Sequence, residues 1–99
     1  MTVFFPDTVN IRNIDEITQK ILPEISSNNE IELNLDNCGD IDLSALQLVE
    51  SIRVYAASAG KHVKLSSPAN AVVASVLARA GFTEAMSRED RLFWLHKED

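Results

Sequence analysis

The sequence predicts an α/β fold in which a small, mostly parallel sheet of four to five strands carries helices mainly on one face. Short runs with strand-like alternation are separated by longer segments with helical spacing, in the order β-β-α-β-α-β-α-β. This alternation implies parallel neighbours joined by right-handed helical crossovers. Ile31, Leu33 and Leu35 alternate with polar residues, whereas strands covered on both faces are apolar throughout. The 99 residues suffice for one core, so a single domain over 1–99 is expected.

The N-terminal segment predicts two short strands. Val3–Phe5 is an apolar run, Pro6–Asp7 is a turn signal, and Thr8–Ile11 can return as a second strand. These features together predict a hairpin, with its first strand at a sheet edge.

A first helix is predicted from Asn13, which can cap the backbone while Glu16 reaches back three residues later. Pro23 lacks a backbone donor and crowds the preceding turn, so a kink or an early end is expected there. The apolar face of this helix consists of Ile14, Ile17, Ile21, Leu22 and Ile25.

The central stretch, residues 31–48, reads as a strand, a short acidic loop and the start of a second helix. Asn37 and Gly39 break the strand pattern, and the helix is expected to begin near Ser44. Gly60 is placed to end that helix in a left-handed conformation. Its helical spacing is carried by Ala45, Leu48, Val49, Ile52, Ala56 and Ala59.

The C-terminal part predicts a strand over His62–Leu65 and a third helix that opens at Ser67–Pro68 and closes at Gly81. Residues 83–90 are polar and expected to be irregular. Leu92–Leu95 is interpreted as a final strand because of its apolar and aromatic residues.

The composition of the chain argues against several classes of function. The net charge of −6 and the scattered Lys and Arg argue against nucleic-acid binding. No apolar run approaches the length of a membrane span and the N-terminus does not resemble a signal peptide, so a cytoplasmic address is expected. Cys38 is the single cysteine; with no basic group beside it in the sequence, it is interpreted as a partly buried residue rather than a nucleophile.

The element order and the sequence Asp42-Leu43-Ser44-Ala45-Leu46 resemble the STAS domain, the family of bacterial anti-sigma factor antagonists and of the cytoplasmic domains of sulfate transporters. The resemblance runs from about Val9 to Leu95 and is most specific over 31–47, 59–65 and 66–72. Asp42 matches the family's aspartate and Ser44 its phosphorylatable position. Ala45 stands where the family usually has glycine.

The resemblance implies a protein-interaction domain whose partner is an anti-sigma factor that is also a serine kinase. The unmodified domain would bind this partner, and phosphorylation of Ser44 would release it. The docking surface is expected to comprise Asp40, Asp42, Ser44, Ala45 and Gln47.

Ser44 also has a structural interpretation, because Ser44 and Gln47 fit a capping box. The two interpretations are compatible, since phosphorylation of a capping hydroxyl adds a charge of about −2 beside Asp40 and Asp42. The alternative to a switch is a constitutive STAS subunit of a bacterial ABC lipid-transport or chemotaxis assembly, in which Ser44 only caps.

No catalytic constellation and no phosphate-binding glycine loop is visible, so neither an enzyme nor a cofactor is expected. Asp36, Asp40 and Asp42 lack the glycine and the later glutamate of a calcium loop, and no metal site is predicted.

Overall fold

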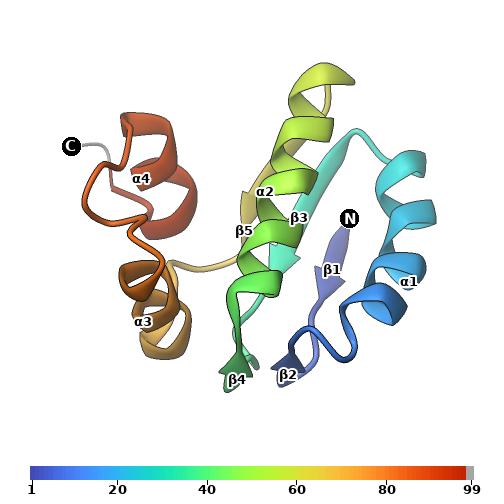
Figure 1. Ribbon diagram of the computed structural model, residues 1–99. Helices are drawn as coiled ribbons and strands as arrows, with labels where there is room; N and C mark the ends of the chain where they lie inside the picture. The colour runs from blue at the N-terminus through green and yellow to red at the C-terminus, as the bar shows by residue number, and fades with distance from the viewer. Residues whose placement is uncertain (98–99) are drawn as a thin grey trace.

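The computed structural model describes residues 1–97 and has an α/β fold (Figure 1). Its elements in chain order are β1 (Thr2–Phe4), β2 (Thr8–Val9), α1 (Ile14–Ser27), β3 (Glu30–Asn34), β4 (Asp40–Ile41), α2 (Leu43–Ser58), β5 (His62–Leu65), α3 (Ala71–Arg79) and α4 (Arg88–Leu95). The prediction of parallel strands joined through helices is confirmed.

The strands form two small parallel sheets, one of order β1-β3-β5 and one of β2 with β4. The predicted single sheet of four to five strands is therefore wrong. The predicted hairpin is also wrong, since β1 runs parallel to β3 and β2 runs parallel to β4. The reason lies at Pro6–Asp7, where the chain passes from one sheet to the other instead of turning back. The Asp7 carbonyl accepts from the N–H groups of Gly39 and Asp40, which fixes the acidic loop against this crossing point.

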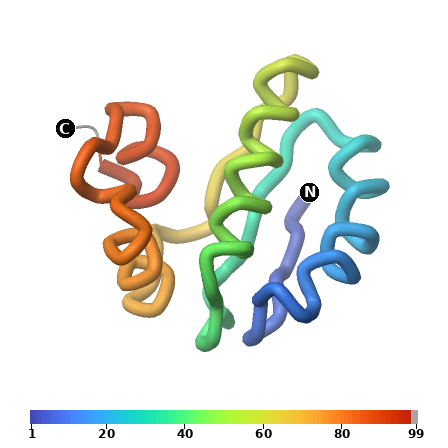
Figure 2. Tube along the Cα trace, in the orientation of Figure 1, coloured from blue at the N-terminus to red at the C-terminus, as the bar shows by residue number. Residues whose placement is uncertain are grey.

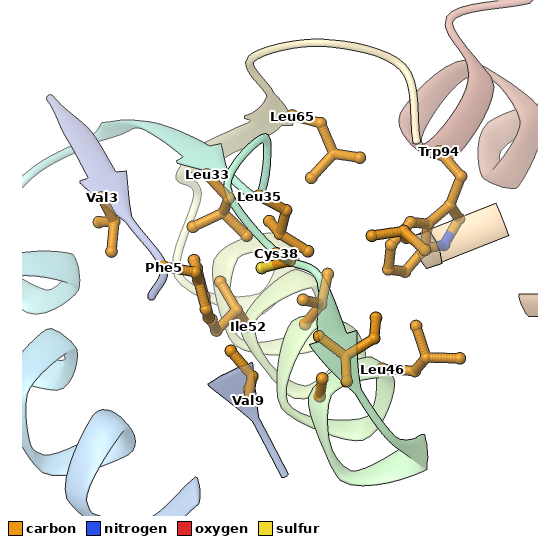
Figure 3. Close-up of a cluster of buried hydrophobic side chains, with 14 of the residues drawn as sticks. Val3, Phe5, Val9, Leu33, Leu35, Cys38, Leu46, Ile52, Leu65 and Trp94 are labelled. Carbon is orange, nitrogen blue, oxygen red and sulfur yellow. The ribbon is translucent and has the colours of Figure 1, made fainter. Parts of the chain in front are cut away.

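Helix α2 lies in front of the three-stranded sheet, α1 stands on the side of β1, and α3 and α4 stand on the side of β5 (Figures 1 and 2). Side chains that point toward the helices form the core, and many of them are drawn in Figure 3. The opposite side of the sheet carries exposed Thr2, Phe4, Glu30, His62 and Lys64. The alternation of apolar and polar residues in the sequence therefore marked the covered face correctly.

Helix α1 continues through Pro23 to Ser27, so the expected early end is wrong. Pro23 is on the exposed side of the helix, where water can satisfy the carbonyl that its missing N–H leaves free. The opposite side of the helix packs against the core through Ile17, Ile21 and Ile25, which lie before and after the proline in the chain.

Helix α3 begins three residues later than predicted. Its N-cap is Asn70, whose Oδ1 accepts from the N–H of Val73 at 2.8 Å. The Asn70 amide also donates to the carbonyl of Cys38 at 3.1 Å. Asn70 thus starts the helix and ties it to the acidic loop, while the Ser67 hydroxyl donates to Asp36 of the same loop at 3.2 Å instead of capping the helix.

The strand predicted over Leu92–Leu95 is wrong, because these residues complete α4. A capping box starts this helix: Ser87 Oγ accepts from the Asp90 N–H at 3.1 Å, and the Ser87 N–H donates to the Asp90 carboxylate at 3.4 Å. Buried Phe93 and Trp94 then face the rest of the fold. A local capping signal has outweighed the β propensity of the aromatic run.

Arg53 on α2 joins α4 to the rest of the domain. Its guanidinium donates to Glu50 at 2.8 Å and to Asp90 at 3.0 Å, and it lies 4.4 Å from the centre of the Phe93 ring. The side chain is only 19% exposed, so these contacts are partly shielded from water. Burial by itself raises the pKa of Asp90, but hydrogen bonds from Arg53 and Ser87, together with the Arg53 charge, bring it below its ordinary value.

Replacing Arg53 should therefore loosen α4. We expect Arg53→Met to lower the free energy of unfolding by about 1–3 kcal/mol, because the variant leaves Asp90 without its cation and removes the contact with Phe93. Urea denaturation followed by Trp94 fluorescence measures this. The exposed Arg12→Met is the control and should change stability by less than about 0.5 kcal/mol. Equal stability of the two variants would show that Arg53 does not hold α4.

Candidate functional site

The candidate site lies where β4 ends and α2 begins, and it is built around Asp42. Asp42 has an extended backbone and is the N-cap of α2. Its Oδ1 accepts from the Ser44 N–H at 2.9 Å and also from the Ser44 hydroxyl. Its Oδ2 accepts from the Ile11 N–H at 3.0 Å. One carboxylate thus holds both the first turn of α2 and the loop that leads into α1.

The predicted capping box of Ser44 with Gln47 is wrong. Ser44 lies inside the first turn and donates its hydroxyl to the capping residue instead of acting as the cap. Pairing of β4 with β2 sets this arrangement, because it keeps the chain extended up to Asp42. The first residue with helical geometry is then Leu43, one position before the predicted start.

The predicted docking residues differ in how accessible they are. Asp40 and Gln47 are exposed, and Asp42 is intermediate. Ser44 is only 9% exposed, at the rim of the core. Ala45 is 2% exposed and belongs to the hydrophobic core, so its side chain is not available to a partner.

The hydrogen bond from the Ser44 hydroxyl is the main reason that the pKa of Asp42 lies below its ordinary value. Burial opposes this effect, and the backbone N–H groups of Ile11, Ser44 and Ala45 reinforce it. Asp42 is therefore ionised at neutral pH, and the Ser44 hydroxyl faces a negative charge.

Two exposed apolar residues adjoin Asp42. Ile11, which is 72% exposed, donates its backbone N–H to the Asp42 carboxylate, and Leu43, which is 47% exposed, follows Asp42 in the chain. Beside Leu43, a hollow of about 260 Å³ lies between the start of α2 and α3. Its lining consists of Ile41, Asp42, Leu43, Val76, Arg79 and Ala80. Sequence reasoning missed Ile11, because strand alternation with buried Val9 places it on the inward face. The sequence likewise did not indicate that Leu43 is exposed, because apolar residues are frequent along this helix.

The acidic loop before β4 offers little chemistry of its own. Within residues 1–97, no three His, Cys, Asp or Glu side chains gather as a metal site would require. Cys38 is buried and its Sγ lies 3.3 Å from the Pro6 carbonyl. Burial, followed by the charges of Asp7 and Asp36, raises the pKa of this thiol to about 11, so it is a poor nucleophile at neutral pH.

Comparisons with protein-family models, with curated proteins and with solved structures find no match for this chain. Across the described part of the chain, every helix is too short or too polar to cross a membrane.

Removing the Asp42 carboxylate should destabilise the fold. We expect Asp42→Ala to cost about 1–2 kcal/mol of unfolding free energy, because it leaves the N–H groups of Ser44 and Ile11 without their acceptor. Thermal unfolding followed by circular dichroism measures the effect. Asp40→Ala is the matched control, since Asp40 is an exposed aspartate two residues away, and it should change stability by less than about 0.5 kcal/mol.

The charge of Asp42 should contribute stability only above its pKa. A carboxyl whose pKa is lower in the folded state stabilises the fold above the unfolded value, here 3.8, and this contribution disappears as pH falls through the folded value. Asp42→Asn keeps a capping oxygen but removes the charge. We expect wild type to be more stable than Asp42→Asn at about pH 6, and the difference to shrink toward about pH 2.5. A constant difference in urea denaturation across this range would contradict the prediction.

Proposed function

We propose that this chain is a STAS-type protein-interaction domain that docks a partner protein at the start of α2. The resemblance of the Asp42–Leu46 segment supports this function, and so does the surface around it. The docking surface comprises Ile11, Asp40, Asp42, Leu43 and Gln47. It combines exposed apolar and acidic side chains, the mixture of apolar and polar residues that protein interfaces use, and two of its residues, Asp42 and Leu43, line the hollow between α2 and α3.

The observation that carries the proposal is the bond between the Ser44 hydroxyl and the Asp42 carboxylate. Phosphorylation of Ser44 replaces this donor by a group with a charge of about −2, directly against an ionised carboxylate. The repulsion pushes Asp42 away, and the N–H groups of Ser44 and Ile11 then lose their acceptor. The first turn of α2 and the loop that carries Ile11 belong to the docking surface, so the modification releases a bound partner. The acidic side chains fit a partner with a basic docking face, and a serine kinase would supply the phosphate.

Ser44 is reached only when the first turn of α2 opens, because its side chain is 9% exposed. Helix ends open at a small fraction of the cost of global unfolding, so this requirement slows the kinase without excluding it. The same burial favours a second candidate function, a constitutive subunit of a lipid-transport or chemotaxis assembly. In that function Ser44 only supports the Asp42 cap.

Affinity measurements on the partner captured from native cells separate the two functions. For the switch, mass spectrometry should find phosphate on Ser44 after incubation with ATP and that partner. Ser44→Asp should weaken binding by about tenfold or more, whereas Ser44→Ala should change it by less than about threefold. Ser58→Asp, an exposed position at the far end of α2, is the matched control and should bind as wild type does. Circular dichroism confirms that each variant is folded.

Absence of phosphate on Ser44, together with unchanged binding by Ser44→Asp, would remove the switch. If the captured partner were then a transport ATPase or a chemotaxis protein, the constitutive function would be the correct one. Failure of Asp40→Lys and Leu43→Asp to weaken binding would overturn the docking surface in both cases.

A further inference from the structure

Arg79 lies across the hollow from the candidate site. It is the last residue of α3, it is exposed, and it lines the hollow together with Asp42 and Leu43 at the start of α2. Within residues 1–97 it forms no ion pair, although the ionised Asp42 lines the same hollow. An arginine in the last turn of a helix interacts favourably with the helix dipole, but this interaction does not use the fork of N–H donors that its guanidinium carries.

The wall of the hollow that carries Arg79 is held in place without help from α2 at its start. Val76, one turn earlier on α3, also lines the hollow and is 5% exposed, so this part of the helix rests on the core. At the other end of α3, the Asn70 amide donates to the Cys38 carbonyl, a bond that involves no residue of α2. Helix α3 therefore keeps its attachment to the acidic loop when the first turn of α2 opens.

A phosphate on Ser44 would lie against negative charge. The Ser44 hydroxyl is bonded to the Asp42 carboxylate, and exposed Asp40 lies two residues before Asp42. Among the residues that line the hollow, Arg79 supplies the positive charge. A guanidinium can bind a phosphate through two parallel N–H···O bonds, which are stronger than bonds between neutral groups.

We propose that Arg79 holds the phosphate once Ser44 is modified. This inference rests on the function proposed above, in which phosphorylation of Ser44 releases a partner. The phosphate moves away from the ionised Asp42 and pairs with the guanidinium at the hollow. The pair occupies the space of about 260 Å³ that Asp42 and Leu43 of the docking surface line. The first turn of α2 thus gains a second position, bound to α3, in which a partner cannot enter the hollow.

Phosphorus NMR tests the pairing on the isolated domain with phosphoserine placed at position 44 during synthesis. A cation beside a phosphate favours the dianion and so lowers the second pKa of the phosphate, which is about 6 for phosphoserine. Arg79→Gln should therefore raise this pKa by about 0.5 or more, since Asp40 and Asp42 oppose the dianion equally in both proteins. Arg12→Gln is the matched control, because Arg12 follows Ile11 of the docking surface but does not line the hollow, and it should change the pKa by less than about 0.2.

Thermal unfolding provides a second measurement. In the unmodified domain Arg79→Gln should change Tm by less than about 2 °C, because Arg79 is exposed and forms no ion pair within residues 1–97. In the phosphorylated domain the same substitution should lower Tm by about 4 °C or more, because it removes the cation that holds the phosphate.

Three results would overturn the proposal: a phosphate pKa that Arg79→Gln leaves unchanged, an equal effect of this variant on Tm with and without phosphate, or a larger effect of Arg12→Gln. So would loss of the circular dichroism spectrum of the folded domain on phosphorylation, since the pair needs α3 in place. None of these measurements uses a partner, so each outcome leaves the release of a partner to be decided by Ser44→Asp. Unchanged binding by Ser44→Asp would remove that release without altering the phosphate pKa.

Discussion

The carboxylate of Asp42 is the constraint on which the candidate site depends. It holds together two segments that are distant in sequence: the loop after β2, and the joint where β4 ends and α2 begins. Two further contacts prepare its position, since the Asp7 carbonyl holds Gly39 and Asp40, and the Asn70 amide holds the Cys38 carbonyl. The acidic loop is therefore fixed by neutral backbone and amide groups. Of its carboxylates, Asp36 accepts from the Ser67 hydroxyl at 3.2 Å and Asp40 is exposed.

The same carboxylate explains why a small covalent change at Ser44 could have a large effect. A hydroxyl that merely capped a helix would leave the surrounding loops in place after modification. Here the hydroxyl contacts the residue that caps, and that residue also anchors Ile11. One ionised group thus couples the buried Ser44 hydroxyl to the backbone of Ile11, whose side chain is exposed, and this coupling is the physical basis of the switch proposed above.

Features determined locally could be predicted from the sequence, and features determined by distant partners could not. The alternation of Ile31, Leu33 and Leu35 correctly identified the covered face, and Gly60 does end α2 with a positive φ of 70°. The hairpin prediction failed because β1 and β2 find their partners about 30 residues away, in β3 and β4. Leu92–Leu95 was misassigned although Ser87 and Asp90 carry a helix-start signature, because aromatic β propensity was given more weight than the cap.

The same distinction applies to the site. The place of the loop-to-helix joint was predicted, but Ser44 was taken as the cap, whereas the pairing of β4 with β2 keeps the chain extended as far as Asp42, which is the N-cap. Ile11 reached the site through a contact spanning 31 residues, which no local pattern reveals.

The loop between β2 and α1 has side-chain contacts that do not depend on the Asp42 carboxylate. The loop between them has its own hydrogen bonds: Asn13 accepts from the Asn10 N–H and donates to the Thr8 carbonyl, each at 2.8 Å, and Asn10 accepts from the Arg12 N–H at 2.9 Å. Loss of the bond from Ile11 to Asp42 leaves all three in place. None of these bonds involves Asp42 or Ser44, and they hold the chain as it approaches Ile14, where α1 begins. The start of α1 therefore depends on the asparagine side chains of this loop, whereas the start of α2 depends on Asp42.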